Sequence, residues 1–186
     1  MSAEPQRQQL MDERAVTRTL ARMAREIVEL NAGVEGLSLL GIQRRGVQLA
    51  ERIAGEIEGA EATRPPVGTL DITLYRDDLT AIGPRPVLGE TRLPEGGIDD
   101  RRLVIIDDVL YTGRTVRAAL DELADFGRPA RIFLCVLVDR GGRELPIQPD
   151  VVGRVVQVRP GGRVEVLVPE LDDRLAVELR GGEASP

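Results

Sequence analysis

The sequence predicts one α/β domain built on a mostly parallel sheet that is flanked by helices. Short apolar runs typical of buried strands alternate along the chain with longer segments whose apolar residues recur at helical spacing. The chain has 186 residues, a usual length for one domain, and 42% of them are hydrophobic, which is ordinary for a globular protein. We therefore expect residues 1–186 to form a single domain.

The first predicted helix covers residues 12–30, after a polar start, residues 1–9, that we expect to be disordered. One face of this helix is apolar because Val16, Leu20, Met23, Ile27 and Leu30 recur every three or four positions. The opposite face carries a stripe of arginines, Arg14, Arg18, Arg22 and Arg25. The stripe is either the solvated side of a surface helix or a surface for an anionic partner.

The elements that follow alternate between strand and helix. Strands are predicted at 37–42, 67–75, 103–106 and 131–138, and helices at 47–58 and 115–126. Residues 76–97 are rich in glycine, proline and charge, and loops of this length are usually functional or mobile. Residues 139–186 are expected to add shorter strands at 151–158, 164–168 and 175–179, around turns rich in glycine and proline.

Composition excludes several kinds of chemistry. The 25 basic residues are all arginine, and histidine is absent, so Schiff-base catalysis, histidine-based triads and histidine zinc sites are excluded. The single cysteine, Cys135, lies in an apolar run and is expected to be a small buried hydrophobe. We expect a cytoplasmic protein with no membrane span. A net charge of −6 argues against a broadly basic coat for nucleic acid, but not against a local basic surface.

The most informative stretch runs from the apolar strand at 103–106 to the helix at 115–126. Asp107 and Asp108 follow the strand, and their carboxylates can accept hydrogen bonds from neighbouring hydroxyls. The next turn supplies threonine hydroxyls, a glycine and the free amides of a helix N-terminus, which favour a phosphate. Carboxylates for a diol followed by a cradle for a phosphate indicate a ribose 5-phosphate site. A solvated aspartate pair and a simple helix cap would explain less of this pattern.

Residues 103–115 resemble the phosphoribosyl pyrophosphate (PRPP) motif of the type I phosphoribosyltransferases. Their form, Asp-Asp-Val-Leu-Tyr-Thr-Gly-Arg-Thr, is similar to that of the pyrimidine operon attenuation protein (PyrR) family. The stretches at 70–79, 127–129 and 138–147 support the narrower match. The resemblance covers residues 10–153 and implies the type I phosphoribosyltransferase fold, with a small hood and a flexible loop at 76–97. Residues 139–186 are expected to contribute to the hood and to edge strands.

The resemblance also implies two activities. The first is a uracil phosphoribosyltransferase of pyrimidine salvage, which joins uracil to PRPP with Mg²⁺ and releases UMP and diphosphate. The second is transcription attenuation, in which the protein senses UMP or UTP against PRPP and binds the leader mRNA of pyrimidine genes. Homodimers or homotetramers are expected.

Site residues carry over by position from the same resemblance. Asp107, Asp108 and Arg76 are the expected catalytic residues, and no protein group is expected to hold the metal directly, because PRPP holds Mg²⁺. The expected PRPP and nucleotide ligands are Arg44, Arg45, Gly46, Asp107, Asp108, Val109, Leu110, Tyr111, Thr112, Gly113, Arg114 and Thr115. The expected RNA contacts are Arg18, Arg22, Arg25, Arg143 and Arg154.

Some positions depart from the family's pattern. Histidine usually stands where this chain has Arg25 and Gly142, and arginine where it has Gln148. The usual Asn-Ile-Pro-Thr-Ser stretch is replaced at residues 155–159, near the nucleobase side of the site in the family. Two alternatives therefore stay open: a phosphoribosyltransferase for another base, and a nucleotide-sensing regulator with negligible catalysis.

Overall fold

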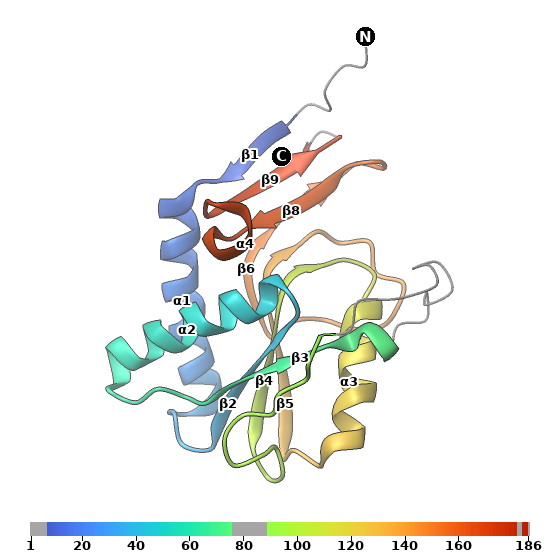
Figure 1. Cartoon of the computed structure of the whole chain (residues 1–186). Helices are drawn as coiled ribbons and strands as arrows, with labels where there is room; N and C mark the ends of the chain where they lie inside the picture. Colours follow the sequence, from blue (N-terminus) through green and yellow to red (C-terminus); the bar gives the residue numbers. More distant parts are fainter. Residues whose placement is uncertain (1–6, 76–88, 182–183, 186) are drawn as a thin grey trace.

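The structure, a computed structural model, describes residues 7–75, 89–181 and 184–185. Its core is a five-stranded parallel sheet in the order β3-β2-β4-β5-β6 (Figure 1). The strands are β2 (Leu37–Ile42), β3 (Val67–Leu70), β4 (Arg102–Leu110), β5 (Arg131–Asp139) and β6 (Val151–Val155). The predicted parallel α/β sheet is confirmed.

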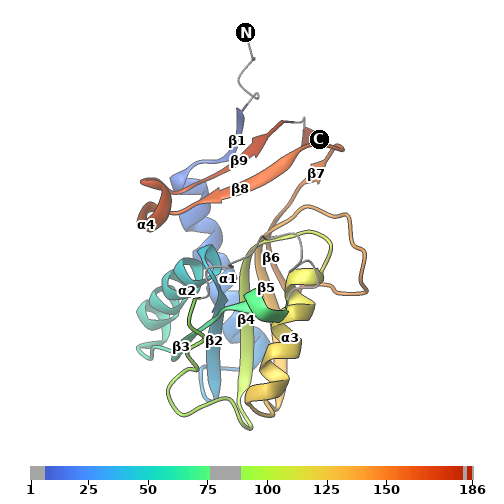
Figure 2. The same ribbon diagram turned by 45° about the vertical axis from the view of Figure 1, so that its right-hand side comes forward.

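Helices cover both faces of this sheet. The helices α1 (Glu13–Asn31) and α2 (Arg45–Glu61) lie on one face and α3 (Arg114–Phe126) on the other, as Figures 1 and 2 show. Successive side chains of a strand point to opposite faces, so the uninterrupted apolar run of β4 serves both layers. Val104 and Ile106 pack in the α1–α2 cluster, whereas Leu103 and Ile105 pack with α3. Cys135 of β5 is fully buried, as expected.

A small hood lies beyond the carboxyl ends of the parallel strands (Figures 1 and 2). It is an antiparallel sheet in the order β1-β9-β8, formed by β1 (Arg7–Met11), β8 (Arg163–Leu167) and β9 (Ala176–Arg180). The short helix α4 (Pro169–Asp172) connects β8 to β9, and β7 (Gln157–Val158) pairs with β10 (Ala184–Ser185). Val166 and Val177 of the hood belong to the same hydrophobic cluster as α1 and α2, so the hood packs on the core.

Three predicted element boundaries are wrong. Residues 7–9 were expected to be disordered, but they form most of β1, which is held by pairing with β9 far along the chain. The strand predicted at 67–75 ends at Leu70, because the Asp71 carboxylate accepts hydrogen bonds from the amide and hydroxyl of Thr73 and turns the chain into the 3₁₀ helix η1 (Ile72–Tyr75). The strand predicted to end at the aspartate pair continues through it to Leu110.

None of the helices within the described ranges combines the length and the apolar character that crossing a bilayer requires. Of the loop predicted at 76–97, residues 76–88 lie outside the described residues. The part from residue 89 onward runs beside β3, where Thr69 and Arg92 form an isolated antiparallel bridge.

Candidate active site

The carboxyl ends of β2, β3 and β4 open into a cavity of about 400 Å³. This edge is where ligands bind in parallel α/β sheets. The cavity brings together residues from several elements that are far apart in sequence. Its polar lining consists of Gln43, Arg44 and Arg45 after β2, Asp71 and Thr73 after β3, Asp107 and Asp108 in β4, Thr115 in α3, and Arg163 in β8.

The aspartate pair in β4 presents one nearly buried carboxylate and one at the cavity. Asp107 is 6% exposed, and its Oδ1 accepts a hydrogen bond of 2.9 Å from the amide of Asp108. Burial, together with the nearby charge of Asp108, raises the pKa of Asp107 well above its usual value. Asp108 lines this cavity and a neighbouring one beneath the hood. The pair can therefore offer carboxylate oxygens to hydroxyl groups at the floor of the cavity.

The turn between β2 and α2 brings two arginines to the cavity. The peptide bond between Gln43 and Arg44 is cis, and α2 begins at Arg45. Gly46 lies so close to β4 that a Cβ atom there would be 2.5 Å from the carbonyl oxygen of Ile106. Only glycine allows this approach, which sets the N-terminus of α2 directly beside Asp107.

The turn after β4 presents backbone amides at the start of α3. Gly113 adopts a left-handed conformation, with φ of 92°, and caps the helix. The carbonyl oxygen of Thr112 accepts hydrogen bonds from the amides of Glu144 and Leu145, at 2.9 and 3.1 Å. A trans peptide directs its N–H opposite to its C=O, so the amide of Gly113 points away from the segment at 144–145. Such amides at a helix N-terminus suit a phosphate.

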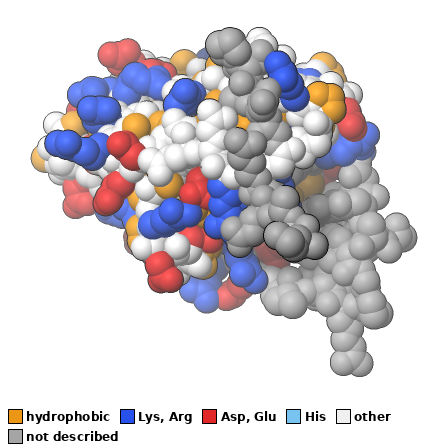
Figure 3. All heavy atoms as spheres, turned by 90° about the horizontal axis from the view of Figure 1, so that it is seen from above, with side chains coloured by type: hydrophobic (Ala, Val, Ile, Leu, Met, Phe, Trp, Pro, Cys, Tyr) orange, Lys and Arg blue, Asp and Glu red, His pale blue; other side chains and the backbone are white. Residues whose placement is uncertain are grey.

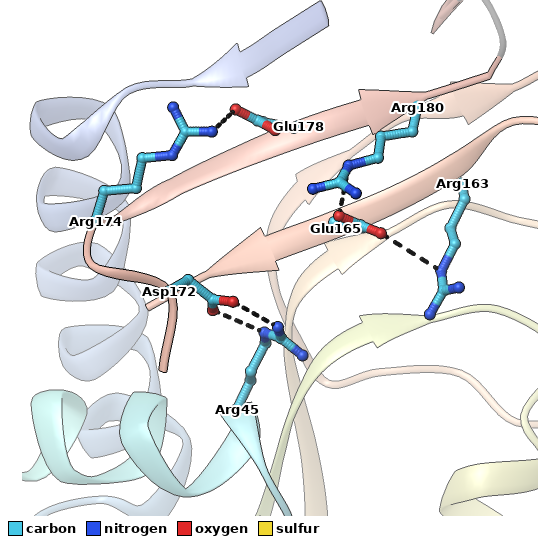
Figure 4. Close-up of polar contacts among 7 residues, drawn as sticks. All are labelled: Arg45, Arg163, Glu165, Asp172, Arg174, Glu178 and Arg180. Atoms are coloured by element: carbon cyan, nitrogen blue, oxygen red, sulfur yellow. Dashed lines mark hydrogen bonds and ion pairs between the residues drawn. The ribbon is translucent and has the colours of Figure 1, made fainter. Parts of the chain in front are cut away.

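A second cavity of about 300 Å³ lies between the sheet edge and the hood. Arginines and carboxylates alternate around it: Arg45 pairs with Asp172 of α4, and Glu165 of β8 lies between Arg163 and Arg180 (Figure 4). Arg45, Asp108 and Arg163 line both cavities, which therefore adjoin. The hood thus closes one side of the site with charged side chains.

Sequence reasoning missed several residues of these cavities. Asp71 and Thr73 could have been found, because they follow a predicted strand at the functional edge of the sheet. Arg163 and Asp172 gave no such signal, since Asp172 meets Arg45 across 127 residues of sequence. Arg76, expected to be catalytic, lies outside the described residues.

Tyr111, one of the expected PRPP ligands, is about half exposed, and the guanidinium carbon of Arg140 lies 3.9 Å from the centre of its ring.

Four of the five arginines expected to bind RNA line one surface cavity of about 470 Å³ between α1 and β6. They are Arg18, Arg22, Arg25 and Arg154. Arg22 also joins the two elements, because its Nη2 donates to the carbonyl oxygens of Val152 and Gly153, at 3.0 and 2.6 Å. We call this surface the α1–β6 arginine surface. At the hood end of the molecule, arginine and acidic side chains are mixed (Figure 3).

Arg143, the fifth, does not line that cavity. Its guanidinium donates to Asp139 at 2.6 Å, to the carbonyl oxygen of Tyr111 at 3.0 Å and to that of Ile147 at 2.9 Å. Only 14% of its side chain is exposed. Burial raises the pKa of Asp139, but hydrogen bonds from Arg143 and the Gly141 amide outweigh burial and hold this pKa below its usual value. Arg143 is thus turned inward, where it supports the turn after β4.

Comparison with known proteins places the chain among the phosphoribosyltransferases. The family model described as the phosphoribosyl transferase domain matches residues 6–163. A protein of Herpetosiphon aurantiacus named bifunctional protein PyrR is 56% identical over 164 residues, which cover 88% of this chain and 91% of that protein. The protein of the same name from Thermus thermophilus is 56% identical over 171 residues, 92% of this chain and 94% of the relative.

Solved structures share the fold at low sequence identity. A hypoxanthine phosphoribosyltransferase of Staphylococcus aureus has a TM-score of 0.66 and 17% identity, and the match covers 96% of this chain and 93% of that one. A hypoxanthine-guanine phosphoribosyltransferase of Bacillus anthracis has a TM-score of 0.69 and 14% identity, over 93% and 97%. These likenesses show that the chain has the phosphoribosyltransferase fold.

Proposed function

Because the chain belongs to the PyrR family of the phosphoribosyltransferases, we propose that it joins uracil to PRPP, with release of diphosphate, and regulates pyrimidine genes by nucleotide-dependent binding to their leader mRNA. One observation supports the catalytic part most strongly. The aspartate pair, Thr115 in the first turn of α3 and the arginines after β2 all line one cavity at the carboxyl edge of the sheet. The protein acts in the cytoplasm as a homodimer or homotetramer.

Each group of the cavity has a chemical role in this proposal. Asp107 and Asp108 accept hydrogen bonds from the ribose hydroxyls, and the amides and hydroxyls of residues 111–115 hold the 5-phosphate. Arg44 and Arg45 hold the pyrophosphate, which leaves as the C1–O bond breaks through an oxocarbenium-like transition state. Catalysis then depends on stabilising the leaving pyrophosphate rather than on a covalent nucleophile.

The residues present fit a magnesium ion that PRPP itself brings. Among the described residues, no three acidic or cysteine side chains are arranged to hold a metal. Mg²⁺ usually keeps several waters and binds through substrate phosphates, so the oxygens of PRPP would hold it in the cavity beside Asp108. When bound, the ion would neutralise charge on the pyrophosphate.

Turnover tests the catalytic proposal. Purified protein with Mg²⁺, PRPP and uracil should form UMP. Asp108→Asn should lower kcat/KM by roughly 10²-fold, because the enzyme binds the transition state less tightly without a charged hydrogen-bond acceptor for the ribose hydroxyls. Hypoxanthine, guanine and adenine are assayed in parallel. Turnover of one of these bases but not of uracil would show that the protein is a phosphoribosyltransferase for that base. Tight UMP binding without turnover of any base would show that it is a nucleotide-sensing regulator.

The α1–β6 arginine surface supports the regulatory proposal, because it gathers arginines on one face and leaves Arg18 and Arg25 exposed to contact phosphates. A gel shift with the organism's own pyrimidine leader RNA should show a complex that UMP strengthens. The absence of any shift at low salt, with and without UMP, would contradict the regulatory role. Light scattering on the same sample measures the oligomeric state.

A further inference from the structure

Arg45, one of the two arginines after β2, is held from the hood by a carboxylate. Its Nε donates to Oδ2 of Asp172 at 3.1 Å and its Nη2 to Oδ1 at 2.8 Å, so both oxygens of Asp172 are engaged along one edge of the guanidinium (Figure 4). Such a two-point contact fixes the plane of the group as well as its position. The third nitrogen is directed away from Asp172.

Asp172 is itself fixed from behind. The amide of Val168 donates to its Oδ2 at 3.0 Å, and its side chain is 18% exposed. Proline at the first position of α4 and a left-handed residue, Asp173, directly after it hold this single helical turn in place. The hydrogen bonds from Arg45 lower the pKa of Asp172, although partial burial opposes them, so the carboxylate is charged at neutral pH.

Arg45 faces more than one negative charge. Asp108 on β4 and Glu165 on β8 both attract it, although less than Asp172 does. Glu165 is itself paired with Arg180 at 2.7 Å. Asp108 lines the same two cavities as Arg45, but the hydrogen bonds of Arg45 go to Asp172. Asp172 is therefore the carboxylate that sets the orientation of the guanidinium.

We propose that Asp172 is a positioning residue that holds Arg45 by one edge, so that its remaining donors are available to the pyrophosphate of PRPP. This inference rests on the proposed function and adds a distinction between ligands. Ligands that carry pyrophosphate depend on the Arg45–Asp172 pair, whereas UMP, which lacks this group, does not. The hood thereby contributes to recognition of PRPP from a position outside the PRPP motif.

The fold provides a matched control. Glu170, also on α4, pairs at 2.9 Å with Arg52, also on α2, so the two ion pairs join the same two helices. Only the pair of Asp172 involves a residue that lines the cavity. If Asp172 merely docked the hood, removing either carboxylate would have the same effect.

Calorimetry with the full chain tests the proposal. For Asp172→Asn we expect the Kd for Mg²⁺-pyrophosphate and the KM for PRPP to rise about tenfold, as loss of one charge-assisted hydrogen bond predicts, with the Kd for UMP within about twofold of wild type. Glu170→Gln should leave all three constants unchanged. In an Arg45→Gln background, Asp172→Asn should add nothing, because the effect passes through Arg45.

Several results would overturn the proposal. These are equal losses of UMP and pyrophosphate affinity, the same loss in Glu170→Gln, or an undiminished effect in the Arg45→Gln background. If Asp172→Asn loses its cooperative thermal transition, Asp172→Glu replaces it. This variant keeps the charge, and the pyrophosphate constant should again rise while the UMP constant does not. A wild-type protein that binds neither UMP nor pyrophosphate would refute the proposed function, and this inference with it.

Discussion

At the scale of single residues, Asp107 is a carboxylate held almost completely out of water. Burial, and then the charge of Asp108, raises its pKa in the folded protein, whereas the unfolded chain restores the usual value. Between those two pKa values the folded state binds more protons than the unfolded state. The free energy of unfolding therefore falls as pH rises through this window, so the buried carboxyl group of Asp107 destabilises the fold above it.

Replacing this carboxylate by an amide should stabilise the protein and impair its site. In Asp107→Asn the side-chain oxygen can still accept the Asp108 amide, but no charge is buried. We expect the Tm at pH 7.5 to rise by about 2–4 °C, the shift that about 1 kcal/mol produces in a domain of this size. The KM for PRPP should rise in the same variant. Differential scanning calorimetry from pH 5 to 8 should also show a flatter pH dependence.

The exposed pair Arg117–Asp121 on α3 supplies the control for this prediction. Asp121→Asn removes a carboxylate of ordinary environment and should change the Tm by less than about 1 °C, because surface ion pairs contribute little. A Tm for Asp107→Asn below that of wild type would show that the buried charge is compensated in the folded protein, contrary to the prediction.

The site residues that could be predicted from the sequence are those that lie together in one continuous segment. The aspartate pair and the turn that follows it form one continuous segment, so strand, acids and helix start are readable together. The inward position of Arg143 could not be predicted, because its partners Tyr111 and Asp139 become neighbours only when β4 and β5 pair. The partner of Arg45 was hidden for the same reason.

At the scale of elements, the segment 89–92 is fastened between β3 and α3. Thr91 joins the two elements through one hydroxyl: its Oγ1 accepts the amide of Asp71 at 2.9 Å and donates to Oε1 of Glu122. Glu122 is 2% exposed, and its other oxygen has no partner within the described residues. The hydrogen bond from the Thr91 hydroxyl therefore offsets part of the free-energy cost of burying this carboxylate.

Removing that hydroxyl should destabilise the fold. Thr91→Val keeps the shape of the side chain but leaves both carboxylate oxygens of Glu122 unpaired, and we expect the free energy of unfolding to fall by about 1–3 kcal/mol. Urea denaturation measures the loss, and hydrogen exchange at the Asp71 amide should report it locally. Thr17→Val on the exposed face of α1 is the matched control.

A second substitution separates the loss of pairing from a change in packing. Adding Glu122→Leu to Thr91→Val removes the unpaired carboxylate, so the double variant should recover most of the lost stability. If Thr91→Val alone unfolds at the same urea concentration as wild type, Glu122 finds another partner and the role given to Thr91 is wrong.

Element types were more predictable than element ends. The helices and parallel strands follow from apolar periodicity, which burial enforces along whole segments. The ends of strands are set by single contacts, such as the Asp71 turn that stops β3 and the pairing with β9 that orders residues 7–9. These contacts join distant segments or depend on one side chain, and periodicity does not register them.

At the scale of the whole molecule, a net charge of −6 coexists with the α1–β6 arginine surface. The protein as a whole therefore repels RNA, and attraction requires a local arginine-rich surface such as this one. Arg18 and Arg25 are exposed and form no ion pair within the described residues, whereas Arg22 is engaged with β6 and with Glu26. Arg18 and Arg25 are accordingly the groups most available to phosphates, and Arg22 mainly joins α1 to the sheet.

This division of roles predicts how salt should act on RNA binding. Each phosphate contact contributes about 0.7–0.9 to the slope of log K against log salt concentration, so Arg18→Gln and Arg25→Gln should each reduce the slope by about that amount. Filter binding of the leader RNA between low and moderate salt measures this slope.

Arg64→Gln, which breaks ion pairs with Glu51 and Glu58 at the amino-terminal side of β3, should leave the slope unchanged. Arg22→Gln should instead lower the Tm, because the carbonyl oxygens of Val152 and Gly153 lose their donor. An unchanged slope in both exposed-arginine variants would exclude this surface as the RNA contact, since no phosphate can be neutralised there without a salt-dependent release of counterions.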